Sequence, residues 1–96
     1  MNDEQQTEKD DSAERERERV RERDAGIQAS VDRYIQAGRE LRAALRAGDD
    51  KAVFECDRLR REITRNAIRA RTGARWDELY GAACTAEARR IAGQEA

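Results

Sequence analysis

Arginines are the side chains of this sequence with the clearest chemical potential, and they concentrate in one segment. Seven arginines and one acidic residue, Glu62, lie between Arg58 and Arg75. Guanidinium groups bind phosphates and carboxylates with two parallel hydrogen bonds and are favoured at interfaces. At about 100° per residue, one helix face would carry four of these arginines together with two large apolar side chains. This face, termed the arginine stripe, consists of Phe54, Arg58, Arg61, Arg65, Ile68 and Arg69.

The arginine stripe admits two functional interpretations and one structural interpretation. It could contact a partner protein that carries acidic groups. It could also bind phosphates, which would make the protein a small nucleic-acid-binding regulator that uses segment 58–75. In the structural interpretation it is a solvated face whose arginines pair with acids of the N-terminal segment or of a neighbouring helix. A net charge of −1 and the lack of a helix-turn-helix signature argue against tight nucleic-acid binding, so we expect a protein partner first.

Other residue types offer no catalytic, metal or nucleotide-binding pattern. The sequence has no histidine, which excludes Cys–His and Ser–His–Asp arrangements. Cys56 and Cys84 are too far apart for a zinc motif, and we expect the first to be buried and the second half-exposed. The acidic pairs Asp49–Asp50 and Asp77–Glu78 fall where helix N-termini favour acids. We therefore expect no enzyme activity, no metal and no cofactor, and no small-molecule ligand is evident from the sequence.

The helices that must position the stripe are indicated by two apolar series with alternating spacings of three and four. This spacing is typical of helices that pack side by side. Between the two series, Gly48 suits a left-handed helix end, and Asp49 or Asp50 suits the next N-cap. The pattern predicts an antiparallel helical hairpin. The first series is Val20, Ile27, Val31, Tyr34, Gly38, Leu41 and Leu45, and the second is Ala52, Cys56, Leu59, Ile63, Asn66 or Ala67, and Ala70.

The predicted fold is all-α, with a single helical domain over residues 13–96. A polar tail over residues 1–12 is expected to be frayed or disordered. A long charged helix over 13–47 pairs with a helix over 50–72, which ends before Gly73. A short third helix over 74–92 has a thin apolar set, and its Trp76, Leu79 and Tyr80 are expected to close the open end of the hairpin.

Two positions within the span of the first series, Gly38 and Asp24, depart from the apolar pattern. Gly38 costs about 1 kcal/mol in a helix interior. We therefore expect it to admit a close helix or an aromatic ring such as Tyr34 or Trp76. Asp24 occupies a core-type position, where it either sets the register of the helices or marks where the core ends, and we expect the second.

A chain in which 43% of residues are charged and 4% are aromatic would gain from burial against a second copy. We predict a helical-bundle homodimer with the first helix at the interface. No apolar run is long enough for a membrane span, and the polar N-terminus lacks secretory-signal features. A cytoplasmic, non-enzymatic adaptor or regulatory module is therefore expected, acting by protein–protein interaction. The predicted dimer seam consists of Val20, Ile27, Val31, Tyr34, Leu41 and Leu45.

Overall fold

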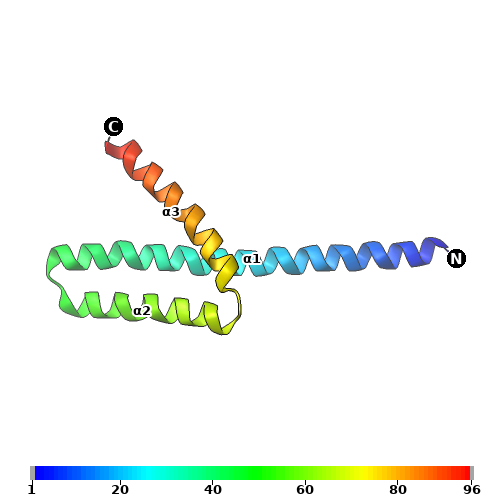
Figure 1. Ribbon diagram of the computed structural model, residues 1–96, viewed down its shortest axis with the longest axis horizontal. Coiled ribbons are helices and arrows are strands. Elements are labelled where there is room, and N and C mark those ends of the chain that lie inside the picture. The colour runs from blue at the N-terminus through cyan, green and yellow to red at the C-terminus, as the bar shows by residue number, and fades with distance from the viewer. Residues whose placement is uncertain (1, 96) are drawn as a thin grey trace.

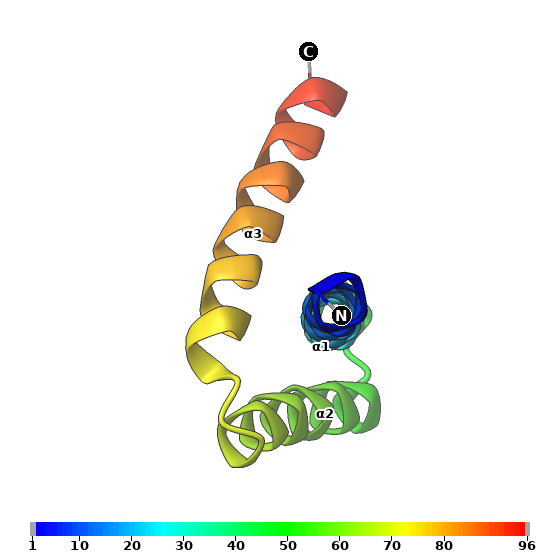
Figure 2. The ribbon, with the colours of Figure 1, turned by 90° about the vertical axis from the view of Figure 1, so that its right-hand side faces the viewer.

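Residues 2–95 form three α-helices, which confirms the predicted all-α fold class (Figure 1). The computed structural model describes the backbone of residues 2–95 and the side chains of residues 11–94. Helix α1 spans Asn2–Ala47, α2 spans Asp50–Arg69 and α3 spans Gly73–Glu95. α1 and α2 lie side by side in opposite directions, as the antiparallel hairpin requires (Figure 1). α3 also packs against α1, but it leaves the hairpin at a steep angle (Figure 2).

Helix α1 begins at Asn2, well before the start near residue 13 that the charge pattern predicts. The part of α1 that precedes Asp24, the residue that pairs with Arg75 of α3, extends past the end of the hairpin as a single helix and is termed the overhang (Figure 1). Opposite charges three residues apart support it locally, and Arg19 pairs with Glu16 at 3.6 Å. The sequence predicts a frayed or disordered tail over residues 1–12. Most of its side chains lie outside the described residues, so this stays a prediction.

The turn between α1 and α2 follows the chemistry of Gly48 and Asp49. Gly48 has a φ of 68°. Its N–H donates to the Leu45 carbonyl at 3.2 Å, and the Asp49 N–H donates to the Ala44 carbonyl at 3.0 Å. These two bonds end α1 in a Schellman motif. The Asp49 carboxylate then accepts a bond of 3.1 Å from the Ala52 N–H, so Asp49 is the N-cap of α2.

The connection between α2 and α3 corrects the predicted helix end. α2 ends at Arg69 rather than at residue 72, because Arg71 adopts the left-handed conformation with a φ of 60°. The N–H groups of Arg71 and Thr72 make a second Schellman pair of backbone bonds, each 3.0 Å long. Arginine therefore occupies the position where glycine is usual. Gly73, the predicted stop, is the first residue of α3.

The hydrophobic core lies where the three helices meet, at the open end of the hairpin. Toward the turn, the contact between α1 and α2 continues over the buried Ala37 and Ala44, whose small side chains allow close approach. Ala67, rather than Asn66, makes the core contact of the second series. The buried core residues are Ile27 and Val31 of α1, Ile63 and Ala67 of α2, and Trp76 of α3.

Trp76 attaches α3 to the hairpin, in the place where the sequence predicts it. It is 6% exposed, and its indole N–H donates to the Ser30 hydroxyl at 3.2 Å. Its ring meets Tyr34 edge to face at 5.2 Å between centroids and stacks on Tyr80 at 5.1 Å. Such aromatic pairs stabilise by about 0.5–1.5 kcal/mol beyond burial. Leu79 completes the apolar contact from α3.

The molecule is elongated because the overhang and α3 leave the hairpin in different directions (Figure 1). The radius of gyration is 19.4 Å and the extents are 71 × 36 × 16 Å. A compact domain of this size has a radius of gyration of about 13 Å. In the part of the chain that is described, no helix has an apolar stretch of the length needed to cross a membrane.

Candidate interaction surface

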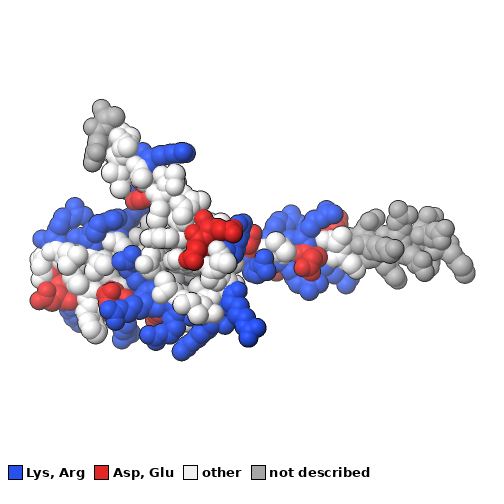
Figure 3. Space-filling view, in the orientation of Figure 1, with Lys and Arg blue, Asp and Glu red and all other residues white. Residues whose placement is uncertain are grey.

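The arginine stripe lies on the open face of α2. Its two apolar members are largely exposed, Phe54 by 70% and Ile68 by 72%. Its four arginines are exposed as well. Basic side chains gather along the hairpin with acidic ones between them, and the described part of the overhang also carries both charges (Figure 3). The structure therefore brings all six residues of the stripe to one accessible face.

The opposite face of α2 fixes this orientation. Ile63 and Ala67 are buried in the core, and Leu59 packs against it. Residues three and four positions apart share a helix face. Burial of these positions therefore turns the stripe outward.

The stripe has little internal charge compensation. It borders a shallow depression of about 460 Å³, which Asp57, Glu62 and Asn66 also line. Arg61 pairs with Asp57 one turn earlier, at 3.0 Å. Such exposed pairs contribute little to stability because water and salt screen them. Among the described residues, no ion pair joins the other three stripe arginines to an acid.

Arg60 is the arginine of α2 that sequence reasoning leaves out of the site. Its guanidinium carbon lies 4.3 Å from the centre of the Tyr34 ring, a cation–π contact. The same group packs against Gly38, where an added Cβ would lie 3.9 Å from it. The space beside Gly38 therefore holds an arginine, not the expected aromatic ring. The Arg60 Nε is buried and has no hydrogen-bond partner in the described structure.

Two groups of charged side chains connect α1 with α3. Arg75 donates to both carboxylate oxygens of Asp24, at 3.4 and 3.1 Å. Asp24, which precedes the first buried core residue, Ile27, therefore also binds α3, a contact that the sequence did not predict. Farther along, the Glu87 carboxylate accepts bonds from Arg90 of its own helix and from Arg39 of α1. These bonds, from Arg90 first and Arg39 second, lower the pKa of Glu87 from 4.5 to about 2.

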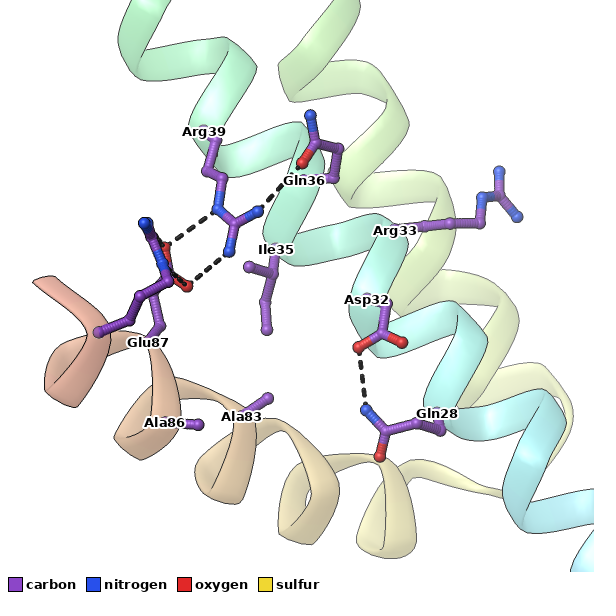
Figure 4. A pocket seen from close by; sticks show the side chains of 10 residues that line it. Gln28, Asp32, Arg33, Ile35, Gln36, Arg39, Ala83, Ala86 and Glu87 are labelled. Atoms are coloured by element: carbon purple, nitrogen blue, oxygen red, sulfur yellow. Dashed lines mark hydrogen bonds and ion pairs between the residues drawn. The ribbon is translucent and has the colours of Figure 1, made fainter.

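A groove of about 650 Å³ separates α1 from α3 beside these charges (Figure 4). Arg39 bridges it and also donates to Gln36 on its own helix at 3.3 Å. Ile35 lies between the two helices and gives the groove an apolar floor (Figure 4). The carboxylate of Glu87 and the guanidinium of Arg39 therefore satisfy each other across the groove.

The predicted dimer seam is divided between the core and the surface of the chain. Val20 and Leu45, at its two ends, are 38% and 61% exposed. The middle of the seam is covered by α2 and α3 and serves the fold of a single chain. An interface between copies would therefore use the ends of the seam. The covered or partly covered members are Ile27, Val31, Tyr34 and Leu41.

The cysteines offer no site of their own. Cys56, predicted to be buried, is half-buried. It lies near the turn of the hairpin, whereas α3 packs against the open end (Figure 1). Cys84, predicted to be half-exposed, is exposed. Within the described residues, no group of three or more metal-ligating side chains comes together.

Sequence reasoning missed Arg60 and the two charged connections between α1 and α3. All of them depend on the path of α3, whose apolar set is too thin to predict how it crosses α1. For Arg60 one signal existed, since it directly follows Leu59 and so lies at the edge of the apolar series.

No family model matches the chain, and neither a curated protein nor a solved structure matches it.

Proposed function

We propose that this protein is a non-enzymatic helical interaction module whose arginine stripe binds an acidic surface of a partner protein. The observation that carries the proposal is the exposure of Phe54 and Ile68, 70% and 72%, among arginines. Single exposed apolar side chains are common. These two lie about 21 Å apart on one helix face, so a partner that covered both would contact the whole stripe.

The two kinds of side chain would contribute in different ways. Full burial of a side chain such as Phe or Ile stabilises by about 1.5–3 kcal/mol, so Phe54 and Ile68 would supply most of the affinity. The arginines would supply the charge preference and the rate of encounter. An acidic partner is favoured because three stripe arginines have no ion pair among the described residues.

A nucleic-acid-binding regulator is the second candidate, since the same unpaired arginines suit phosphates. Two properties of the chain place it second. A phosphate backbone gives Ile68 no apolar counterpart. The first 24 residues contain ten acidic and six basic side chains, which repel a polyanion.

The test compares Arg61→Glu/Arg65→Glu with Arg17→Glu/Arg21→Glu, a control with the same charge change and spacing on the overhang. Proteins that cross-link to the wild type and to the control, but not to the stripe variant, are identified by mass spectrometry. Each is then purified and titrated. We expect the stripe variant to bind at least about tenfold more weakly, a loss of about 1.4 kcal/mol. Circular dichroism should show unchanged helicity, because both arginines are exposed.

Phe54→Ala separates an interface from a structural role. It should weaken partner binding while changing the free energy of unfolding by less than about 0.5 kcal/mol, as exposed positions do. A large loss of stability would show that Phe54 serves the fold.

Fluorescence anisotropy with DNA and RNA oligonucleotides tests the second candidate, the nucleic-acid-binding regulator. Binding that weakens steeply with salt, and is lost only in the stripe variant, would replace the protein partner with nucleic acid.

A further inference from the structure

Arg60 of α2 contacts α1 and lines a hollow beside α3, and among the described residues it has no ion pair with a carboxylate. Its ring contact with Tyr34 engages the face of the guanidinium, and the N–H edge that carries Nε lies beside Gly38, which lines the same hollow. The Nε on that edge is buried and unpartnered. A polar group withdrawn from water without a hydrogen bond costs free energy. An anion that reached this edge would recover that cost.

The hollow that Arg60 lines and the one beside it carry more basic than acidic side chains. Two adjoining hollows between α1 and α3 share Arg42, Glu87 and Ile91 as lining residues. Glu87 is the acid of both linings, and Arg39 and Arg90 already bind it. Low-dielectric walls lined by one sign of charge concentrate ions of the other sign. The arginines of the two hollows are Arg39, Arg42, Arg46, Arg60 and Arg90.

The hollow that contains Arg60, termed the α1–α3 crevice, also has an apolar body. Its volume is about 260 Å³, and Tyr34, Ile35, Gly38, Ala88 and Ile91 line it. Small-molecule sites have this character, an apolar wall with a few convergent polar groups. The size suits a small molecule rather than a peptide helix.

Tyr80 and Cys84 of α3 complete the polar side of the crevice. A hydrogen bond with the Cys84 thiol, with burial as a second cause, raises the pKa of the Tyr80 phenol. The phenol therefore keeps its proton at neutral pH. It adds no negative charge to the crevice beside that of Glu87.

We propose that the α1–α3 crevice binds a small organic acid, with Arg60 holding its carboxylate and the apolar wall holding its body. A carboxylate fits better than a phosphate. Its planar oxygens match the guanidinium fork of Arg60. Arg42, the other arginine of the lining, also has no ion pair among the described residues and adds a second positive charge beside it. No helix N-terminus supplies the further donors that a phosphate uses in the described lining, because its residues lie inside the helices.

Benzoate is the probe, since it joins a carboxylate to a small apolar ring. We expect saturable binding in calorimetric titrations and a matching rise in melting temperature. Arg60→Met should weaken binding at least about tenfold, as expected for the loss of a charge-assisted hydrogen bond. Arg89→Met is the control, because Arg89 is exposed and lies outside both the crevice lining and the arginine stripe, so it should leave benzoate binding unchanged. Benzyl alcohol, the uncharged analogue, should bind at least about tenfold more weakly than benzoate.

A second pair of variants keeps the test valid if Arg60→Met unfolds. Ala88 is exposed and lines the crevice, whereas Ala82 is exposed on the same helix outside it. Ala88→Trp should block benzoate with helicity preserved, and Ala82→Trp should not. Unchanged binding in both Arg60→Met and Ala88→Trp would overturn the proposal, as would tighter binding of inorganic phosphate or no saturable binding of benzoate. These variants leave the arginine stripe intact, so this test is independent of the proposed function.

Discussion

Glu87 joins arginines from two helices, so its protonation state bears on how α3 is held. Its carboxylate accepts bonds from Arg39 of α1 and Arg90 of α3, and its side chain is 15% exposed. Protonation would weaken both pairs together and leave Arg39 without a carboxylate. The lowered pKa, about 2 against the ordinary 4.5, means that the folded chain favours the ionised form.

We expect acid to weaken the contact between α1 and α3 through Glu87. A folded-state pKa below the unfolded value contributes stability that is complete above about pH 4.5. That stability is lost as the pH falls toward about 2. Melting curves followed by circular dichroism between neutral pH and this acidic limit provide the measurement. The Glu87→Gln variant should melt at a lower temperature than the wild type at neutral pH and should depend less on pH.

Glu55→Gln is the control for this prediction. Glu55 is exposed on α2 and takes part in none of the ion pairs found among the described residues. Its variant should follow the pH dependence of the wild type. Identical pH profiles for Glu87→Gln and the wild type would contradict the role assigned to Glu87.

Two neighbouring arginines of α2 show which side-chain positions the sequence can predict and which it cannot. The helical period predicts that Arg61 faces outward, and its side chain is 74% exposed. Arg60 lies about 100° around the helix, at the edge of the apolar series. Nothing in the local pattern foretells that Tyr34 and Tyr80 enclose it, because that depends on where α3 crosses. The arginine stripe was predictable for this reason, and the α1–α3 crevice was not.

Helix ends were predictable where local chemistry decides them. Gly48 and Asp49 carry the usual signals for a left-handed stop and an N-cap, and both are found in those roles. Arg71 carries no such signal, since non-glycine residues with positive φ are uncommon. We attribute its conformation to the packing of Trp76, which draws the chain back into the core directly after α2. Tertiary contact thus overrides the local preference at this end.

Replacing Arg71 with glycine should stabilise the protein. A left-handed conformation costs a residue with a Cβ about 1–2 kcal/mol. Part of the gain is offset by the greater freedom of glycine in the unfolded chain. We expect Arg71→Gly to raise the free energy of unfolding by about 0.5–1 kcal/mol in urea titrations.

The reverse change at the other turn is the matched control. Gly48 has a φ of 68° and no heavy atom near its missing Cβ, so Gly48→Ala adds strain without a clash. It should lower the free energy of unfolding by about 1 kcal/mol. A destabilised Arg71→Gly together with an unaffected Gly48→Ala would show that these turns are not limited by backbone strain.

At the scale of the whole molecule, the surface is large for the mass. The chain exposes 7883 Å², whereas a compact monomeric protein of 11.0 kDa exposes about 5,600 Å². The difference exceeds the area that a standard protein–protein interface buries, about 1,600 Å². The excess comes from the overhang, which is one helix alone, and from the divergence of α3 (Figure 1). Both features favour burial against another chain.

We therefore expect a homodimer, with the ends of the α1 seam at or near the interface. Light scattering should give twice the mass of 11.0 kDa, and the melting temperature should rise with concentration. Leu45→Glu and Val20→Glu change exposed side chains, so they should shift the protein toward monomer with little loss of helicity. Ala43→Glu, on an exposed position of α1 outside the seam, should leave the dimer intact.

Ile27→Asp distinguishes an interface between copies from the core of one chain. Ile27 is 6% exposed within a single chain, and an unpaired buried charge costs several kcal/mol. This variant should therefore unfold, whereas Leu45→Glu should only dissociate. If Ile27→Asp stayed folded as a monomer, the assignment of Ile27 to the core that α1, α2 and Trp76 form within one chain would be contradicted. A wild-type mass of 11.0 kDa at every concentration, with a constant melting temperature, would instead contradict the predicted dimer. In that case a partner other than a second copy of this chain would have to cover the additional exposed surface.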